Sequence, residues 1–120
     1  MSVVLWIINI LLAVVFTVAG LSKVTRPMSA LIAMGMAWVE DSSQKMVRSI
    51  GVLELAGAVG LILPRATGVA AGLTPLAAIG LAAVMLAAIV VHLKRAESVR
   101  TPMILGGLAV VSAGLGFALV

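Results

Sequence analysis

One acidic residue stands in the middle of an apolar run and raises the first chemical question. Glu54 lies within Ile50 to Leu63, IGVLELAGAVGLIL, and every other residue of that run is apolar. A charged side chain at the centre of a membrane helix costs about 2.5–3.5 kcal/mol, so such residues normally face the interior of a bundle. We therefore expect Glu54 to be either paired with a cation or protonated.

Two further residues are candidate partners of Glu54 on other segments. Lys23 closes the first apolar run, and His92 lies at the end of the third. The long aliphatic stem of a lysine allows its ammonium group to reach several ångströms along a helix. We expect Lys23, Glu54 and His92 to form one polar cluster, with Arg65 projecting beyond the helix end on the Glu54 face.

Three interpretations of this cluster remain open at the level of sequence. Lys23 and Glu54 form a buried pair that fixes helix register, with His92 capping its own helix. Alternatively, the cluster binds a quinone or another lipid-like ligand, because an acid and a His can exchange protons with carbonyl oxygens in an apolar pocket. In the third interpretation the cluster contacts a partner protein. No metal is expected, since one His and one Glu supply fewer ligands than the three of catalytic zinc sites.

The composition requires a membrane protein. The chain has 120 residues, of which 63% are hydrophobic and 10% charged, and its mean hydropathy is +1.32. Soluble domains carry about 25% charged residues. The net charge of +4 is attributed to cytoplasmic loops rather than to nucleic-acid binding, because no basic surface with interleaved aromatic residues is present. Cysteine is absent, which excludes disulfides and thiolate chemistry within the chain.

The elements that must position these residues are four membrane-spanning helices in a single domain, residues 1–120. The segment Met28 to Val39 is too short to span and is predicted to lie at the interface as a short helix. Pro64 is expected to end the second span, and Thr74-Pro75 to kink the third. Ser42 or Ser43 is expected to cap the second span. The four spans are predicted over Val3–Leu21, Gln44–Leu63, Gly68–Leu93 and Met103–Val120.

The distribution of cations predicts the topology. Seven of the eight Lys and Arg residues fall in or beside the first and third loops, and Arg65 is alone on the opposite side. The positive-inside rule therefore places loops one and three in the cytoplasm and both termini outside. The glycines of the last span permit close packing, which serves either the bundle itself or an oligomer.

Several short motifs together resemble the DoxX family of small bacterial membrane proteins. They are Gly20-Leu21-Ser22-Lys23, Glu54-Leu55-Ala56-Gly57, Arg65 with Gly68, and Met85, Ala88 and His92 in the spacing MxxAxxxH. The resemblance implies an all-α, four-helix bundle in the bacterial plasma membrane. It also implies a connection to membrane-associated oxidoreductase systems, including a thiosulfate:quinone oxidoreductase subunit, and to assembly chaperones among distant animal relatives. By position, it identifies Lys23, Glu54, Arg65 and His92 as the site residues.

The leading functional hypothesis is an accessory or scaffold subunit of the membrane rather than a stand-alone enzyme. Its expected partners are the lipid bilayer and a membrane or cytoplasmic protein. The sequence has no evident cofactor motif, and a quinone is the cofactor that the cluster could bind. The alternatives are a membrane-protein assembly chaperone, which binds partners through the Met-rich linker and the glycine face of the last span, and a small proton-coupled carrier that uses Glu54.

Overall fold

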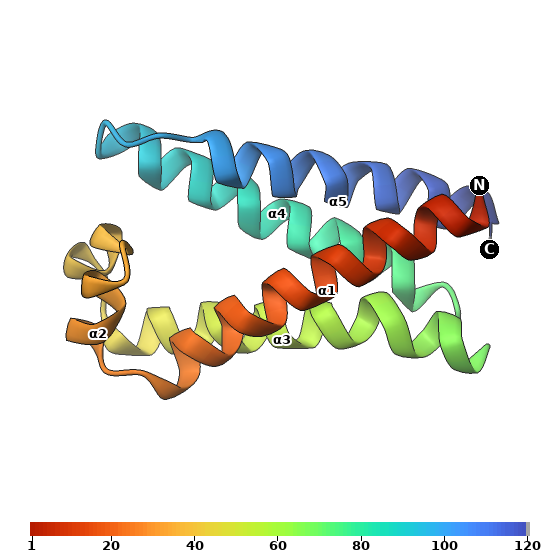
Figure 1. Cartoon of the computed structure of the whole chain (residues 1–120), viewed down its shortest axis with the longest axis horizontal. Helices are drawn as coiled ribbons and strands as arrows, with labels where there is room; N and C mark the ends of the chain where they lie inside the picture. The colour runs from red at the N-terminus through yellow and green to blue at the C-terminus, as the bar shows by residue number, and fades with distance from the viewer. Residues whose placement is uncertain (120) are drawn as a thin grey trace.

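The computed structural model describes residues 1–119 and has no strand among them. Over this range the chain has four long helices. They run side by side along the molecule, with a short helical linker folded at one end (Figure 1). This arrangement confirms the predicted all-α membrane bundle with a short linker between the first two spans. The helices in chain order are α1 (Ser2–Thr25), α2 (Met28–Ala33), the 3-10 helix η1 (Ala37–Asp41), α3 (Gln44–Thr67), α4 (Leu73–Lys94) and α5 (Arg100–Leu119).

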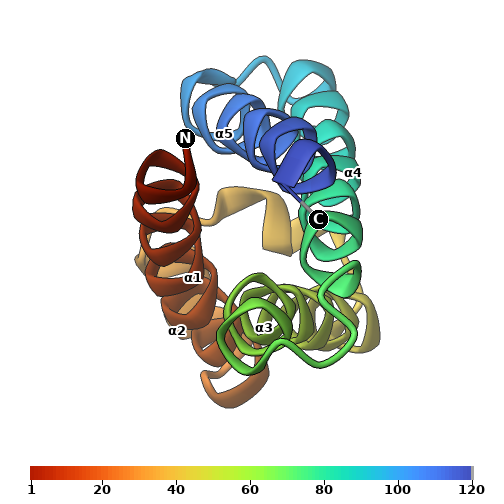
Figure 2. The ribbon, with the colours of Figure 1, turned by 90° about the vertical axis from the view of Figure 1, so that its right-hand side faces the viewer.

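The spans associate as neighbours around a common centre. Helix α1 packs most extensively on α3, and α4 packs on α5, while α3 and α4 join the two pairs. Viewed along the bundle, the four spans form a ring, and the linker crosses its far end (Figure 2). All four spans are long and apolar enough to cross a membrane. The longest dimension of the molecule is 41 Å, close to the thickness of about 40–45 Å of a bilayer with its headgroups.

The two ends of the bundle differ in charge. The charged end carries α2, η1 and the loop Arg95–Val99 between α4 and α5, and the terminal end carries both chain termini and the loop between α3 and α4 (Figure 1). Seven of the eight Lys and Arg residues lie at the charged end, and Arg65 lies at the terminal end. The molecule therefore has the charge asymmetry that the sequence predicted.

The core lies along the inner faces of the spans. On α3, Glu54 is buried, as expected of an acid in an apolar run, and Gly51, Ala58 and Leu61 are buried on the same face. On the outside, large apolar side chains are widely exposed, as lipid-facing surfaces require. The main apolar core consists of Leu12, Phe16, Ala58, Leu61, Ala78, Leu81, Met85, Ala109 and Ala113.

The linker is more broken than predicted. Instead of one helix over Met28–Val39, the chain forms the six-residue α2, turns at Gly35, and continues as η1. Gly35 has a φ of +97°, a left-handed conformation that glycine adopts without steric cost. The linker is held to the start of α3 by its own small core of Leu31, Val39 and Val47.

Two helix ends beside prolines differ from the prediction: the end of α3 beside Pro64 and the start of α4 beside Pro75. Helix α3 continues through Pro64 for one more turn and ends at Thr67, followed by Gly68, whose φ of +72° makes a left-handed C-cap. Helix α4 begins at Leu73, so Pro75 lies in the first turn, where a missing N–H breaks no helical hydrogen bond and causes no kink. The predicted cap of α3 is confirmed, because the Ser43 hydroxyl accepts from the Met46 N–H.

Candidate functional site

The structure brings Lys23 and Glu54 together inside the bundle. Lys23 lies in the last turn of α1, and its Nζ donates to Glu54 Oε1 on α3 over 2.7 Å. The two side chains are only 9% and 2% exposed. Among residues 1–119, Lys23 is the one group that hydrogen-bonds the Glu54 carboxylate. The pair is therefore an ion pair removed from solvent, in which each charge has the other as its partner.

Two glycines bring the helices close enough for this contact. Gly20 lies one turn before Lys23, and Gly51 lies one turn before Glu54. A Cβ at Gly20 would stand 2.8 Å from the carbonyl oxygen of Gly51, and a Cβ at Gly51 would stand 2.9 Å from that of Gly20. No side chain fits between backbones this close, so α1 and α3 cross here by direct backbone contact.

A second cation fixes the main chain of the same turn. Arg48, two turns before Glu54 on α3, donates through its guanidinium to the carbonyl oxygens of Lys23 and Arg26. The last carbonyls of a helix have no partner within the helix, and a guanidinium also complements their partial negative charge. Lys23 is thus bound to α3 by both its ammonium group and its carbonyl oxygen.

His92 does not join this pair, which corrects the expected three-residue cluster. It lies in the last turn of α4, and its Nδ1 contacts Glu97 Oε1 at 2.9 Å. The reason is local: the chain reverses at Ala96, whose φ is +55°, and the Glu97 N–H donates to the His92 carbonyl over 2.8 Å. Glu97 therefore returns beside the imidazole, while Glu54 stays paired inside the bundle.

His92 belongs instead to a network at the charged end, here named the Arg95 network: His92, Arg95, Glu97, Glu40 and Asp41. Arg95 pairs with Glu97 at 3.2 Å, with Glu40 at 3.0 Å, and with Asp41. Hydrogen bonds to Glu97 and Glu40 raise the pKa of Arg95. The pKa of Glu97 is lowered, first by the hydrogen bond from His92 and then by Arg95. The network ties η1 to the α4–α5 loop.

Arg65 lies at the opposite end of the molecule from the Lys23–Glu54 pair. Its guanidinium donates to the Ser2 hydroxyl over 2.8 Å and lies 5.7 Å from the centre of the Trp6 ring, within the range of a cation–π contact. Both partners are on α1. Arg65 thus joins the first turns of α1 to the end of α3, and the four predicted site residues occupy three separate places.

Comparison with known proteins decides the relationship of the chain. The model of the DoxX-like family matches residues 7–114, which is most of the sequence. The chain belongs to the DoxX-like family. Among curated proteins and among solved structures, none matches it.

The DoxX-like bundle also holds a polar contact that the sequence analysis missed. Asn9 of α1 donates through Nδ2 to the carbonyl oxygen of Leu61 on α3 over 3.2 Å. Its Oδ1 accepts from the Ser112 hydroxyl of α5 over 2.5 Å. Asn9 is a polar residue within the apolar first span, but Ser112 sits among small residues with nothing in its spacing to single it out. This contact joins three spans inside the bundle.

Taken together, the polar groups of this DoxX-like protein connect helices to one another. All four acidic side chains are ion-paired within the chain, Glu54 with Lys23 and the other three with Arg95. Within residues 1–119 no group of three or more His, Asp or Glu side chains is placed to hold a metal. The arrangement stabilises helix packing, and each carboxylate is matched by a cation inside the molecule.

Proposed function

We propose that this DoxX-like protein is an accessory membrane subunit, a rigid frame that holds a partner protein in or at the bacterial plasma membrane. The Lys23–Glu54 pair supports this proposal most directly. It joins two spans at a backbone-to-backbone crossing, 2.7 Å from nitrogen to oxygen. The membership in the DoxX-like family favours a membrane-associated oxidoreductase assembly as the setting in which the subunit works.

The same geometry favours a structural role for Glu54 over a proton-coupled or quinone-binding one. A carrier or a quinone site needs a carboxyl group that its substrate can approach. Glu54 is 2% exposed, and it lines neither of the two hollows on the outer side of α3. The imidazole of His92, which would complete a proton-exchanging site, is held by Glu97 in the Arg95 network.

The surface most suited to a partner is the linker at the charged end. Ile32 and Met34 of the α2 region are 38% and 49% exposed, although the segment is fixed by its own small core and by the Arg95 network. Methionine side chains adapt to irregular apolar surfaces and are frequent at binding surfaces. The linker thus combines a fixed backbone with exposed apolar side chains outside the spans.

Site-specific photo-crosslinking in native membranes tests the proposal. A photoreactive residue replaces Met34 in the linker or, as the control, Val110, which is 61% exposed on α5. We expect the Met34 variant to form an adduct with one defined second protein, and the Val110 variant to form none. Adducts with lipid or with a second copy of the chain at both positions would contradict the accessory role.

A further inference from the structure

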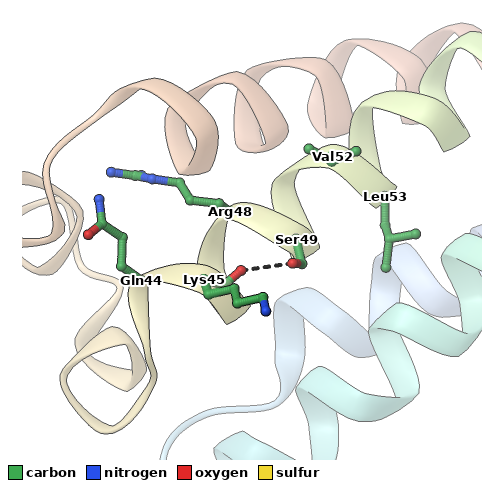
Figure 3. Close-up of a pocket in the computed structure, with 6 residues that line it drawn as sticks. All are labelled: Gln44, Lys45, Arg48, Ser49, Val52 and Leu53. Atoms are coloured by element: carbon green, nitrogen blue, oxygen red, sulfur yellow. Dashed lines mark hydrogen bonds between the residues drawn. The ribbon is translucent and has the colours of Figure 1, made fainter.

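The outer face of α3 carries a groove that the helix-packing role does not use. At the charged end a hollow of about 760 Å³ is lined by α3 residues alone, shown in Figure 3. It meets a second hollow, of about 430 Å³, at Leu53, which lines both. The second hollow lies between α3 and α4. The lining of this α3–α4 groove changes from polar residues at the charged end (Gln44, Lys45, Arg48, Ser49) to small and apolar ones (Ala56, Gly57, Ala77, Gly80, Ala83, Val84) deeper in the membrane.

The length of the groove corresponds to one leaflet. From Lys45 to Gly57 the helix rises about 18 Å, at 1.5 Å per residue, and one leaflet of hydrocarbon is about 15 Å thick. Lys45, in the first turn of α3, stands at headgroup level and is exposed. Leu53 is 57% exposed and lies where the two hollows meet. The groove therefore accepts an extended chain along its depth and a headgroup at its mouth.

The charges at the mouth determine the kind of headgroup. Because all four acidic side chains are paired with Lys23 or within the Arg95 network, Lys45 and Arg48 have no carboxylate of the chain left to bind. The Arg48 side chain points toward the segment after α1, whereas the Lys45 side chain, on the same helix, points in another direction (Figure 3). Arg48 already donates to the carbonyl oxygens of Lys23 and Arg26, which carry no net charge. Its guanidinium and the Lys45 ammonium group, at the end of an apolar groove, therefore favour an external anion with an apolar tail.

We infer that the α3–α4 groove binds one anionic phospholipid, with its phosphate at Lys45, where Arg48 adds positive charge, and an acyl chain along Leu53, Gly57 and Gly80. Basic pockets beside membrane helices bind anionic headgroups, and each Lys or Arg near the surface contributes about 1 kcal/mol, which corresponds to about a fivefold change in affinity. This site is separate from the Lys23–Glu54 pair and does not depend on the proposed accessory role.

Native mass spectrometry of the purified, delipidated full chain tests the inference. The probes are phosphatidylglycerol, phosphatidylcholine with the same acyl chains, and glycerol phosphate. We expect one phosphatidylglycerol molecule to bind at least fivefold more tightly than phosphatidylcholine. Glycerol phosphate, which has no acyl chain, should not bind. Lys45→Gln weakens phosphatidylglycerol binding about fivefold, and Lys94→Gln, which removes an exposed cation outside the groove, leaves it unchanged.

A matched pair of glycine variants tests the position of the acyl chain. A Cβ at Gly80 meets nothing within 4 Å, and the same holds for Gly114 on α5. Gly80→Leu therefore starts from open space and adds bulk to the groove, and Gly114→Leu serves as its control. We expect only Gly80→Leu to lower phosphatidylglycerol affinity. If Gly80→Leu does not fold, Ala83→Phe fills the groove from another exposed position.

Four outcomes would overturn the inference. The first two are that phosphatidylcholine or glycerol phosphate binds as tightly as phosphatidylglycerol. The third is that Lys45→Gln and Lys94→Gln change phosphatidylglycerol affinity equally, and the fourth is that Gly80→Leu and Gly114→Leu do so. A dimer that forms through the groove and excludes phosphatidylglycerol would also overturn it.

Discussion

Each carboxylate of this chain is held by cations of the chain itself, but the surroundings of these pairs differ. Glu54 pairs with Lys23 where almost no solvent reaches, whereas Glu97 is 28% exposed beside Arg95. Removing one member of a buried pair leaves an uncompensated charge and costs about 3–5 kcal/mol. Exposed pairs contribute about 0–1 kcal/mol each. At the scale of residues, the Lys23–Glu54 pair therefore stabilises the bundle, and the Arg95 network holds the α4–α5 loop and η1 together.

The lowered pKa of Glu97 predicts that the stability of the α4–α5 loop depends on pH. Because the pKa is lower in the folded protein than its ordinary value of 4.5, Glu97 stabilises the network above that value. The stabilisation is lost as the pH falls through the lowered pKa. We expect the hydrogen-exchange protection factors of the α4–α5 loop to fall as the pH drops below 4.5, with the spans unaffected. In the Glu97→Gln variant, protection of this loop should no longer depend on pH in that range. If protection still fell with acid to the same extent, Glu97 would not be the group responsible.

At the scale of helices, the crossing of α1 and α3 depends on two glycines as much as on the ion pair. A Cβ at Gly51 would lie 2.9 Å from the Gly20 carbonyl oxygen and 2.9 Å from Lys23 Cβ. Atoms this close must move apart, and the movement would also lengthen the contact between Lys23 and Glu54. Small residues at such crossings are what allows membrane helices to associate.

Gly51→Ala is therefore expected to destabilise the protein, by about 1–3 kcal/mol as for other overpacked sites. Gly107→Ala on α5 is the control, because a Cβ at Gly107 meets nothing within 4 Å. Steric-trapping or denaturant unfolding in micelles measures both variants. The control should equal the parent protein or exceed it slightly. Equal stabilities of the two variants would show that the helices do not meet as described.

The whole molecule is polarised along its long axis, and this polarity predicts its orientation. Seven of eight Lys and Arg residues lie at the charged end, so we expect that end to face the cytoplasm. Since the chain has no cysteine, single cysteines report orientation cleanly. In intact cells an impermeant maleimide should label Val69→Cys, exposed by 71% at the terminal end, and not Met34→Cys, exposed by 49% in the linker. The reverse pattern would reject this orientation.

The number, type and order of the spans could be predicted from the sequence, because hydropathy is summed over a whole helix and does not depend on any single backbone conformation. The burial of Glu54 follows from the same apolar surroundings. The contact between Lys23 and Glu54 could also be predicted, because an acid in an apolar run faces the bundle interior and needs a cation there. The place of His92 could not be read, since it depends on the reversal at Ala96, a single backbone conformation that brings Glu97 back to the imidazole. The role of Pro75 depended likewise on where α4 begins.

A double-mutant cycle on the Lys23–Glu54 pair tests the central claim, that the pair is a structural link between α1 and α3. Unfolding free energies in micelles are compared for the parent, Lys23→Met, Glu54→Leu and the double variant. Each single change should cost about 3 kcal/mol or more, and the double variant should recover most of that loss, because two apolar side chains leave no unpaired charge. Single variants as stable as the parent, or a double variant that loses the sum of both effects, would contradict the account.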